Sequence, residues 1–242
     1  MSAPPSYADS VASRPLKLPV FDFLKGKRVI LASGSLRRKE LLNQVGITEF
    51  EVIKSDFEEN LDKSSLSVYE YVRETASQKA LRVYQREIEA GRDPALVISA
   101  DTVILSQNTI VEKPKSAMDH FRMLQSLRDE EFPHRVFTAV VCIAPLEQPV
   151  YPGYNMQSHT EETQVYFAKD VSDEFLTAYV AVGEANDAAG GYCIQGKGAL
   201  MIDQIVGDYN NVVGLPLKAL VKLIEKTIYP EEEDFDEATG DF

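Results

Sequence analysis

The chain has 242 residues, 44% of them hydrophobic, and a formal net charge of −13 at pH 7. This length suits one large domain or two small ones, and no run approaches the roughly 20 apolar residues that a membrane-spanning helix needs. The negative charge argues against general binding to nucleic acid. The two cysteines favour a reducing, cytoplasmic compartment. The three histidines are scattered without metal-ligand spacing, which argues against structural zinc.

The two ends of the chain differ in composition from its middle. Residues 1–26 are rich in Pro and Ser and predict a flexible lead-in, which lacks the apolar core of a secretory signal. A mitochondrial transit peptide is a less favoured alternative. Residues 230–242 contain EEEDFDEATGDF, without Lys or Arg, and predict a disordered acidic tail. We therefore expect one folded domain over residues 27–229.

Apolar periodicity predicts the elements in chain order. The first half has a strand at 28–33, a helix at 36–45, a short strand at 50–54, a polar loop at 55–64, a helix at 68–90 ended by Gly91, and a strand at 95–106. The second half has a hairpin strand at 109–111, a helix at 117–127, a strand at 135–144, an extended hairpin loop at 145–158, a strand at 161–169, a helix at 173–182, a strand at 199–206 and a helix at 216–226. These interleaved elements predict an α/β fold, with a mixed sheet flanked by helices in one elongated domain of two lobes.

Residues 30–45 read ILASGSLRRKELLNQV and place a Ser-Gly-Ser turn between strand and helix. Ser35 is a natural N-cap, so Arg37 and Arg38 fall in the first helical turn. Cations there oppose the helix dipole, whereas free N–H groups, a small glycine and two guanidiniums suit a bound anion. A surface helix with an incidental Arg pair is the alternative. One apolar helix face is expected to comprise Leu36, Leu41, Leu42 and Val45.

Acidic candidates occur in two places. Asp101 lies in VISADTV, where an apolar strand is expected to end, and a carboxylate at such a point is typical of α/β active sites. Capping of a turn is the alternative for this residue. Glu58 and Glu59, in the polar loop, are surface charges unless one of them joins Asp101 to hold Mg²⁺, which takes carboxylate oxygens together with substrate phosphate.

Two lysines are candidates for phosphate binding. Lys79 lies among alanines on the long helix, where a lysine also commonly extends along the surface to reach water. Lys113 precedes Pro114, which favours an extended backbone there, and an ordinary loop lysine is the alternative.

The segment 190–198, GGYCIQGKG, contains four glycines that let the backbone pass close to a ligand. Gln195 carries a donor and an acceptor on one amide, which matches the N–H and C=O edge of uracil or thymine. A glycine-rich turn whose glutamine satisfies backbone groups is the alternative.

Together these segments resemble the Maf family of nucleoside triphosphate pyrophosphatases. The matching stretches, in the family's order over residues 27–229, are LASGSLRRKELL, ETASQKA, SADTVIL, VEKP, FTAV, AGGYCIQGKGALMI and GDYNNVVGLPL. The chain is also similar to the Maf-like part of acetylserotonin methyltransferase-like proteins, without the methyltransferase domain. The resemblance implies an inosine-triphosphatase-like fold. It also implies hydrolysis of a nucleoside triphosphate to the monophosphate and pyrophosphate with a divalent metal, Mg²⁺ or else Mn²⁺ or Co²⁺.

The resemblance also implies roles for single residues. Asp101 matches the family's proton acceptor, and Glu59, rather than Glu58, matches the loop glutamate linked to the metal, so that Glu59 and Asp101 are the implied metal ligands. The positions that contact phosphate are matched by Ser33, Arg38, Lys79 and Lys113. The positions associated with a preference for dTTP and UTP are matched by Arg37, Thr102 and Gln195.

The chain departs from the family pattern at Leu36, where Pro is usual and would preset the helix start, and in an insertion at 145–160. Two further readings stay open. The substrate is a modified pyrimidine triphosphate in one, and in the other the protein is a non-enzymatic regulator of cell division or septum formation that binds nucleotide. A homodimer is expected from family likeness alone.

Overall fold

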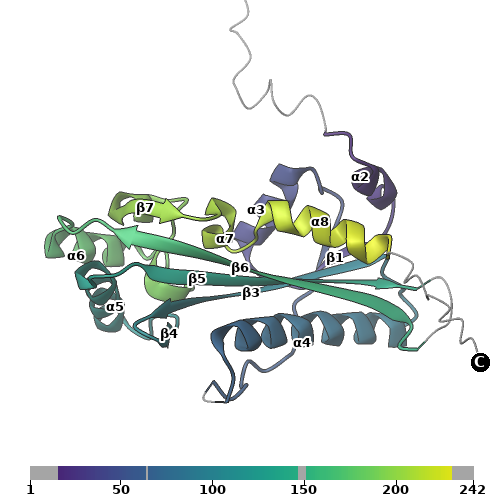
Figure 1. Ribbon diagram of the computed structural model, residues 1–242, viewed down its shortest axis with the longest axis horizontal. Coiled ribbons are helices and arrows are strands. Elements are labelled where there is room, and N and C mark those ends of the chain that lie inside the picture. Colours follow the sequence, from purple (N-terminus) through teal and green to yellow (C-terminus); the bar gives the residue numbers. More distant parts are fainter. Residues whose placement is uncertain (1–15, 64, 147–150, 231–242) are drawn as a thin grey trace, which may run out of the picture.

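The computed structural model describes residues 16–63, 65–146 and 151–230. Within them, a twisted mixed sheet of seven strands runs along an elongated molecule, and helices cover both of its faces (Figure 1). This arrangement confirms the predicted α/β class. No helix in the described part of the chain is both long and apolar enough to cross a membrane.

The strands follow the order β2-β1-β3-β5-β6-β7, and β4 also pairs with β3. β1 is parallel to β2 and to β3, whereas the remaining pairs are antiparallel. The bounds are β1 (Val29–Leu31), β2 (Glu51–Val52), β3 (Leu96–Ser106), β4 (Thr109–Val111), β5 (His134–Pro145), β6 (Tyr154–Phe167) and β7 (Ile202–Val206).

The helices form two layers and one distal group, each with its own apolar cluster. α2 (Pro19–Leu24), α3 (Leu36–Val45), α7 (Tyr209–Val213) and α8 (Leu217–Ile228) lie on one face of the sheet. α4 (Val68–Glu89) covers the opposite face, and α5 (Ala117–Asp129), α6 (Asp173–Val182) and the 3₁₀ turns η1 (Ala189–Gly191) and η2 (Lys197–Met201) pack at one end.

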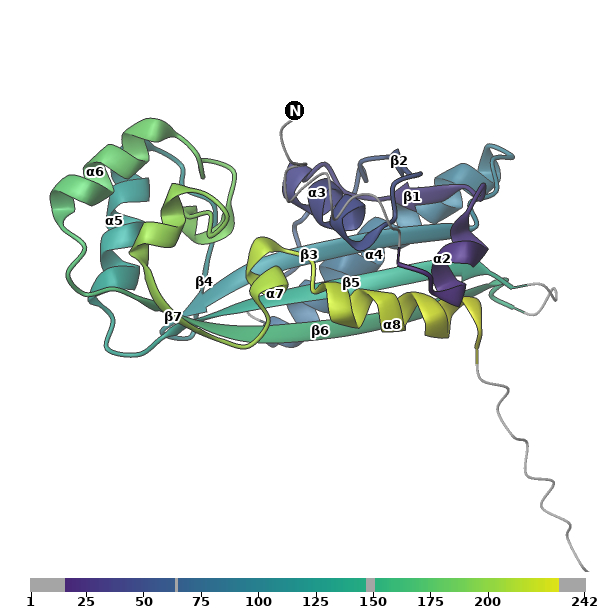
Figure 2. The same ribbon diagram turned by 90° about the horizontal axis from the view of Figure 1, so that it is seen from above.

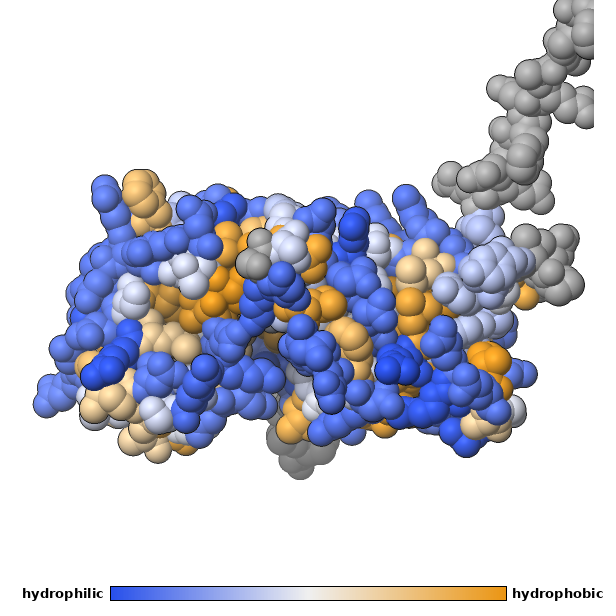
Figure 3. Space-filling model, turned by 90° about the horizontal axis from the view of Figure 1, so that it is seen from below, coloured by the Kyte–Doolittle hydropathy of each residue, from blue (hydrophilic) through white to orange (hydrophobic). Residues whose placement is uncertain are grey.

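The long strands β3, β5 and β6 join two lobes, as expected from the sequence. Figure 2 shows α5 and α6 at one end of these strands and β1, β2, α2 and α3 toward the other. The face that α4 covers is mostly hydrophilic, and apolar side chains reach its surface only in separate patches (Figure 3). The polar outer side of α4 matches its amphipathic sequence.

One edge of β3 has a gap in its pairing that matters for function. β1 pairs with β3 only as far as Leu31 opposite Ile98, and β4 pairs with β3 only from Ile104, opposite Val111, onward. The other edge of β3 is paired with β5 throughout. Between β1 and β4, residues 100–103 of β3 have no strand partner on this edge among the described residues. Residues 100–103 instead line a cleft at this edge.

Several sequence predictions need correction. The loop expected at 145–158 is much shorter, because β5 runs to Pro145 and β6 begins at Tyr154, directly opposite it. The first half of β6 is mostly polar and lacks the apolar alternation that predicts a strand. It forms a strand because its backbone hydrogen-bonds to β5. The strand expected at 199–206 begins only at Ile202, since 197–201 form η2.

The start of the chain also differs from expectation. Within the predicted lead-in, residues 19–24 form α2, which buries Val20, Phe21 and Leu24 in a cluster shared with α8. Residues 1–15 and the acidic segment 231–242 lie outside the described residues. Leu36 was expected on the same helix face as Leu41, but it is 74% exposed. The two residues are five positions apart, and at about 100° per residue their side chains point about 140° apart around the helix.

Candidate active site

A cleft of about 930 Å³ opens at the gap beside β3, and it is lined from both lobes. It brings together every side chain for which the resemblance implies a role. These residues are Ser33, Arg37, Arg38, Glu59, Lys79, Asp101, Thr102, Lys113 and Gln195. Segments separated by more than 150 residues in the sequence thus share one cavity, as the enzymatic interpretation requires.

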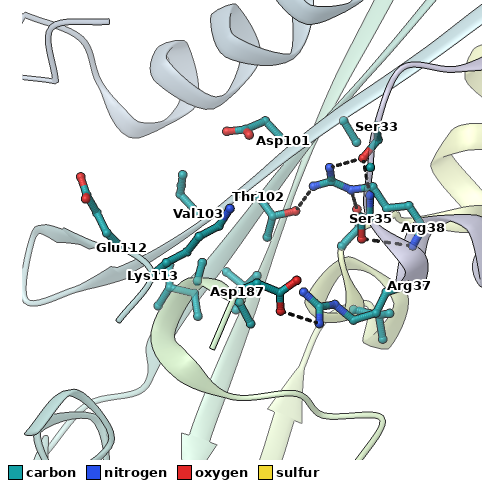
Figure 4. Close-up of a pocket in the computed structure, with 18 of the residues that line it drawn as sticks. Ser33, Ser35, Arg37, Arg38, Asp101, Thr102, Val103, Glu112, Lys113 and Asp187 are labelled. Carbon is teal, nitrogen blue, oxygen red and sulfur yellow. Dashed lines mark hydrogen bonds and ion pairs between the residues drawn. The ribbon is translucent and has the colours of Figure 1, made fainter. Parts of the chain in front are cut away.

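Arg38 is the cation that is most firmly fixed in the cleft. Ser35 caps α3 as predicted, and its hydroxyl accepts the backbone N–H of Arg38. The guanidinium donates to the carbonyl of Gly214 at 2.9 Å, to Ser33 Oγ at 3.1 Å and to Thr102 Oγ1 at 2.9 Å (Figure 4). All three acceptors are neutral, and no described carboxylate lies within ion-pair distance of Arg38.

The environment of Arg38 makes it a good anion receptor. Burial lowers the pKa of the Arg38 guanidinium, and the charge of Asp101 opposes this change. An arginine stays protonated nonetheless. A partly buried positive charge whose hydrogen-bond partners are all neutral is strongly stabilised when an anionic ligand binds to it.

Asp101 occupies the middle of β3, and the expectation that its strand ends there is wrong. The strand that ends beside it is the neighbouring β1. Asp101 is 7% exposed and accepts a hydrogen bond from Lys79 Nζ at 2.8 Å. Lys79 projects from α4, and its ammonium also lies 2.7 Å from Glu59 Oε1. Lys79 therefore joins the carboxylate of the strand to that of the polar loop.

Thr102 lies on the other face of β3, because successive strand residues point to opposite sides. Its hydroxyl contacts Arg38 and, at 3.0 Å, Thr138 of β5. Thr138 in turn donates to the carbonyl of Asn211 in α7. Both faces reach the cleft around the unpaired edge of β3, so that Asp101 and Thr102 line one cavity from opposite sides.

The glycine-rich segment forms the wall of the cleft in the lobe that contains α5 and α6, here called the distal lobe. Gly190 and Gly191 have positive φ angles of 70°, which an L-residue rarely adopts. His120 Nε2 lies 2.5 Å from the carbonyl of Gly191, and the backbone N–H of Cys193 donates to Tyr179 Oη at 3.0 Å. Buried groups of α5 and α6 thus hold this wall from behind.

Gln195 and Arg37 both line the cleft at this wall. Gln195 is exposed at the cleft surface. The Arg37 guanidinium donates to Cys193 Sγ at 3.2 Å and lies 3.9 Å from Asp187. Lys113 extends toward β3 from the opposite side (Figure 4). Its neighbour Glu112, which also lines the cleft, pairs with Lys63.

The cleft offers carboxylate oxygens from Asp101 and Glu59, which are ligands that a divalent metal such as Mg²⁺ takes. No group of three or more His, Cys, Asp or Glu side chains suited to a metal is present in the described part of the chain. Asp101 and Glu59 nevertheless contact the same ammonium. Magnesium typically takes one or two carboxylates together with substrate phosphates and waters. The donor set therefore fits a metal that enters with its substrate.

Sequence reasoning missed several residues that line or support the cleft. Asp187 and Lys54 line it, and Thr138 and Asn211 support Thr102 from behind. Thr138 and Asn211 lie in the motifs FTAV and GDYNNVVGLPL, but the resemblance implied no role for either residue. Lys54 gave no signal, because it is the last residue of the short strand predicted at 50–54, which carries no motif.

Comparisons with known proteins define the class to which the chain belongs. Its residues 28–227 match the family model described as Maf-like protein, and the chain therefore belongs to the Maf family. The resemblance deduced from the motifs is confirmed.

Several similar proteins carry the name dTTP/UTP pyrophosphatase. A dTTP/UTP pyrophosphatase of Schizosaccharomyces pombe is 47% identical over 234 residues, which make up 96% of this chain and 96% of that protein. A dTTP/UTP pyrophosphatase of Dictyoglomus turgidum is 39% identical and covers 84% of this chain and 97% of its own. A Homo sapiens protein named "Probable bifunctional dTTP/UTP pyrophosphatase/methyltransferase protein" is 42% identical over 88% of this chain but only 34% of its own length.

Proposed function

We propose that this protein hydrolyses dTTP and UTP to the monophosphates and pyrophosphate. The observation that carries the proposal is Arg38, a cation for which the described residues supply no carboxylate partner, in a cleft that also holds Lys79 and Lys113. A protein with a net charge of −13 that gathers these cations in one cavity is suited to a compact polyanion. The names of full-length relatives support the same substrate class.

Recognition of the base is assigned to the wall in the distal lobe. The exposed amide of Gln195 offers a donor and an acceptor at the cleft surface, and Arg37 lies at the same wall through its contact with Cys193. Uracil and thymine present the complementary N–H and C=O groups. A modified pyrimidine with the same edge meets the same requirement, so such triphosphates belong among the substrates to be tested.

In the proposed mechanism, Asp101 orients a water molecule and accepts its proton. The water oxygen bonds to the α-phosphorus while the bond from that phosphorus to its bridging oxygen breaks. Pyrophosphate leaves with the electron pair. Arg38, Lys79 and Lys113 bind the phosphate oxygens, and positioning and charge neutralisation supply most of the rate. Lys79 also fixes the Asp101 carboxylate through the 2.8 Å contact.

We assign Glu59 and Asp101 as the ligands of the divalent metal, Mg²⁺ or else Mn²⁺ or Co²⁺. A bound metal supplies positive charge to the phosphate oxygens. The support is the convergence of both carboxylates on one ammonium. Two buried free thiols, Cys142 and Cys193, support a reducing compartment such as the cytoplasm. The homodimer expected from family likeness stays a prediction.

The test is a nucleotide panel with the purified protein. UTP, dTTP, CTP, GTP and modified pyrimidine triphosphates are assayed with Mg²⁺, Mn²⁺, Co²⁺ or chelator, and pyrophosphate is resolved from single phosphate. We expect pyrophosphate as the product, with the highest kcat/KM for UTP and dTTP. The absence of hydrolysis of every triphosphate, or release of single phosphate, contradicts the proposal.

Asp101→Asn provides the matched inactive variant. It keeps the size of the side chain but cannot accept the proton, so we expect turnover to fall by about 10²–10⁴-fold while nucleotide binding persists. Near-normal turnover by this variant removes Asp101 from its assigned role.

A further inference from the structure

Lys54, just after β2, crosses the turn that precedes α3. A Cβ atom added to Gly34 would lie 2.2 Å from Lys54 Cε and 3.0 Å from Nζ. The φ angle of Gly34 is not among the positive values, so the backbone there does not itself require glycine. The absent side chain at position 34 is what allows Lys54 to lie across the turn. Both residues line the cleft.

The cations of the cleft differ in how far their charges are already neutralised. Lys79 contacts two carboxylates, Arg37 lies near Asp187, and Lys63 pairs with Glu112. Lys54, by contrast, has no ion-pair partner among the described residues. A solvated lysine in such a position is free to pair with a ligand.

The place of Lys54 is also favourable for a phosphate. Its ammonium lies over the turn 33–35, next to the first turn of α3, whose backbone N–H groups point outward and carry partial positive charge. The same turn bears Ser33, which contacts Arg38. Lys54 approaches this turn from β2, whereas Arg38 approaches it from α3.

We propose that Lys54 is a substrate-binding residue whose ammonium contacts the phosphate chain of the nucleotide, and that Gly34 is needed chiefly to give it room. This assignment rests on the proposed pyrophosphatase function. It adds a phosphate ligand outside the motifs that carry the family resemblance.

The first test compares Lys54→Ala with Lys39→Ala, an exposed lysine of α3 that lies outside the cleft. We expect Lys54→Ala to lower kcat/KM for UTP about tenfold, mainly through KM, because it removes a charge-assisted contact. The ratio of kcat/KM between UTP and CTP stays unchanged, since Lys54 does not face the base. Lys54→Arg keeps most of the activity. Equal kinetics in Lys54→Ala and Lys39→Ala overturn the assignment.

The second test is a double-mutant cycle with Gly34→Ala, which separates the two residues of the proposal. In the wild-type background, the new Cβ displaces the Lys54 side chain and lowers kcat/KM. In the Lys54→Ala background it meets no lysine, and we expect little further loss. Fully additive effects mean that Gly34 serves another purpose, and they overturn this part of the proposal.

Binding of magnesium pyrophosphate, measured by calorimetry, needs no turnover and so separates the two hypotheses. We expect Lys54→Ala to weaken this binding about tenfold and Lys39→Ala to leave it unchanged. If the wild type hydrolyses no triphosphate but this difference persists, the proposed function fails and the role of Lys54 stands. If hydrolysis occurs and both variants bind pyrophosphate like the wild type, the role of Lys54 fails alone.

Discussion

Glu87 is a buried carboxylate near the end of α4 that ties this helix to the strands beneath it. Its side chain is 2% exposed and accepts hydrogen bonds from Arg92 Nε at 2.9 Å and Arg28 Nη2 at 2.8 Å. Arg28 immediately precedes β1, which leads to the Ser33 turn, while α4 carries Lys79. The substitution Glu87→Gln keeps the size of the side chain but leaves both guanidiniums without this charge.

The structure gives the magnitude and the pH dependence of this change. Hydrogen bonds from Arg92 and Arg28 hold the pKa of the Glu87 carboxyl at about 2, compared with an ordinary value of 4.5. Because the folded-state pKa is the lower one, the stabilisation is complete above pH 4.5 and is lost as the pH falls toward 2. The difference in pKa corresponds to about 3 kcal/mol at pH 7 and about 1 kcal/mol at pH 3.

Urea denaturation of the wild type and Glu87→Gln at pH 7 and pH 3 tests this reasoning. We expect the variant to be less stable by about 3 kcal/mol at pH 7 and the deficit to shrink by about 2 kcal/mol at pH 3. Glu89→Gln, an exposed neighbour on the same helix, serves as the control and changes stability by less than about 0.5 kcal/mol. A deficit that is equal at both pH values refutes the assignment of the stabilisation to the Glu87 charge.

Two further predictions concern the distal lobe. Gln195→Ala lowers kcat/KM for UTP more than for GTP, and an unchanged ratio across the nucleotide panel contradicts base recognition by Gln195. Burial lowers the pKa of His134 to about 4. As the pH falls from 6.5 toward 4, the imidazole therefore binds a proton in the unfolded chain but not in the folded one, and the wild type loses up to about 3 kcal/mol of stability. His134→Gln removes this part of the pH dependence, and an unaltered dependence in urea denaturation between pH 7 and pH 4 shows that His134 is not its source.

The elements with strong local signals are those that the sequence predicted well. α3 and α6 have the predicted bounds, since each has a serine N-cap and a C-terminal glycine with positive φ. The Gln107-Asn108 turn also follows its prediction, with positive φ at both residues. Local chemistry decides such features, and it can be read without knowledge of the tertiary structure.

Features that depend on distant partners escaped prediction. The polar half of β6 becomes a strand only because β5 lies beside it, and α2 is stabilised by burial against α8 rather than by its own short sequence. Lys54 gains its interest from Gly34, twenty residues away, across a turn whose geometry the sequence does not reveal. Local patterns singled out candidates such as Asp101 and Gln195, whereas roles for Ser33 and Thr102 came only from the family motifs.

The gap beside β3 explains why one strand can serve two parts of the site. Within a continuous sheet, the alternation of side chains would separate Asp101 from Thr102 by the thickness of the sheet. Because β1 ends opposite Ile98 and β4 pairs with β3 only from Ile104 onward, the cleft reaches both faces around the free edge. Asp101 meets Lys79 on one side, and Thr102 meets Arg38 on the other. The long pairing with β5 fixes this register, since a slip of one residue would exchange the two faces and place the carboxylate beside Arg38 instead of Lys79.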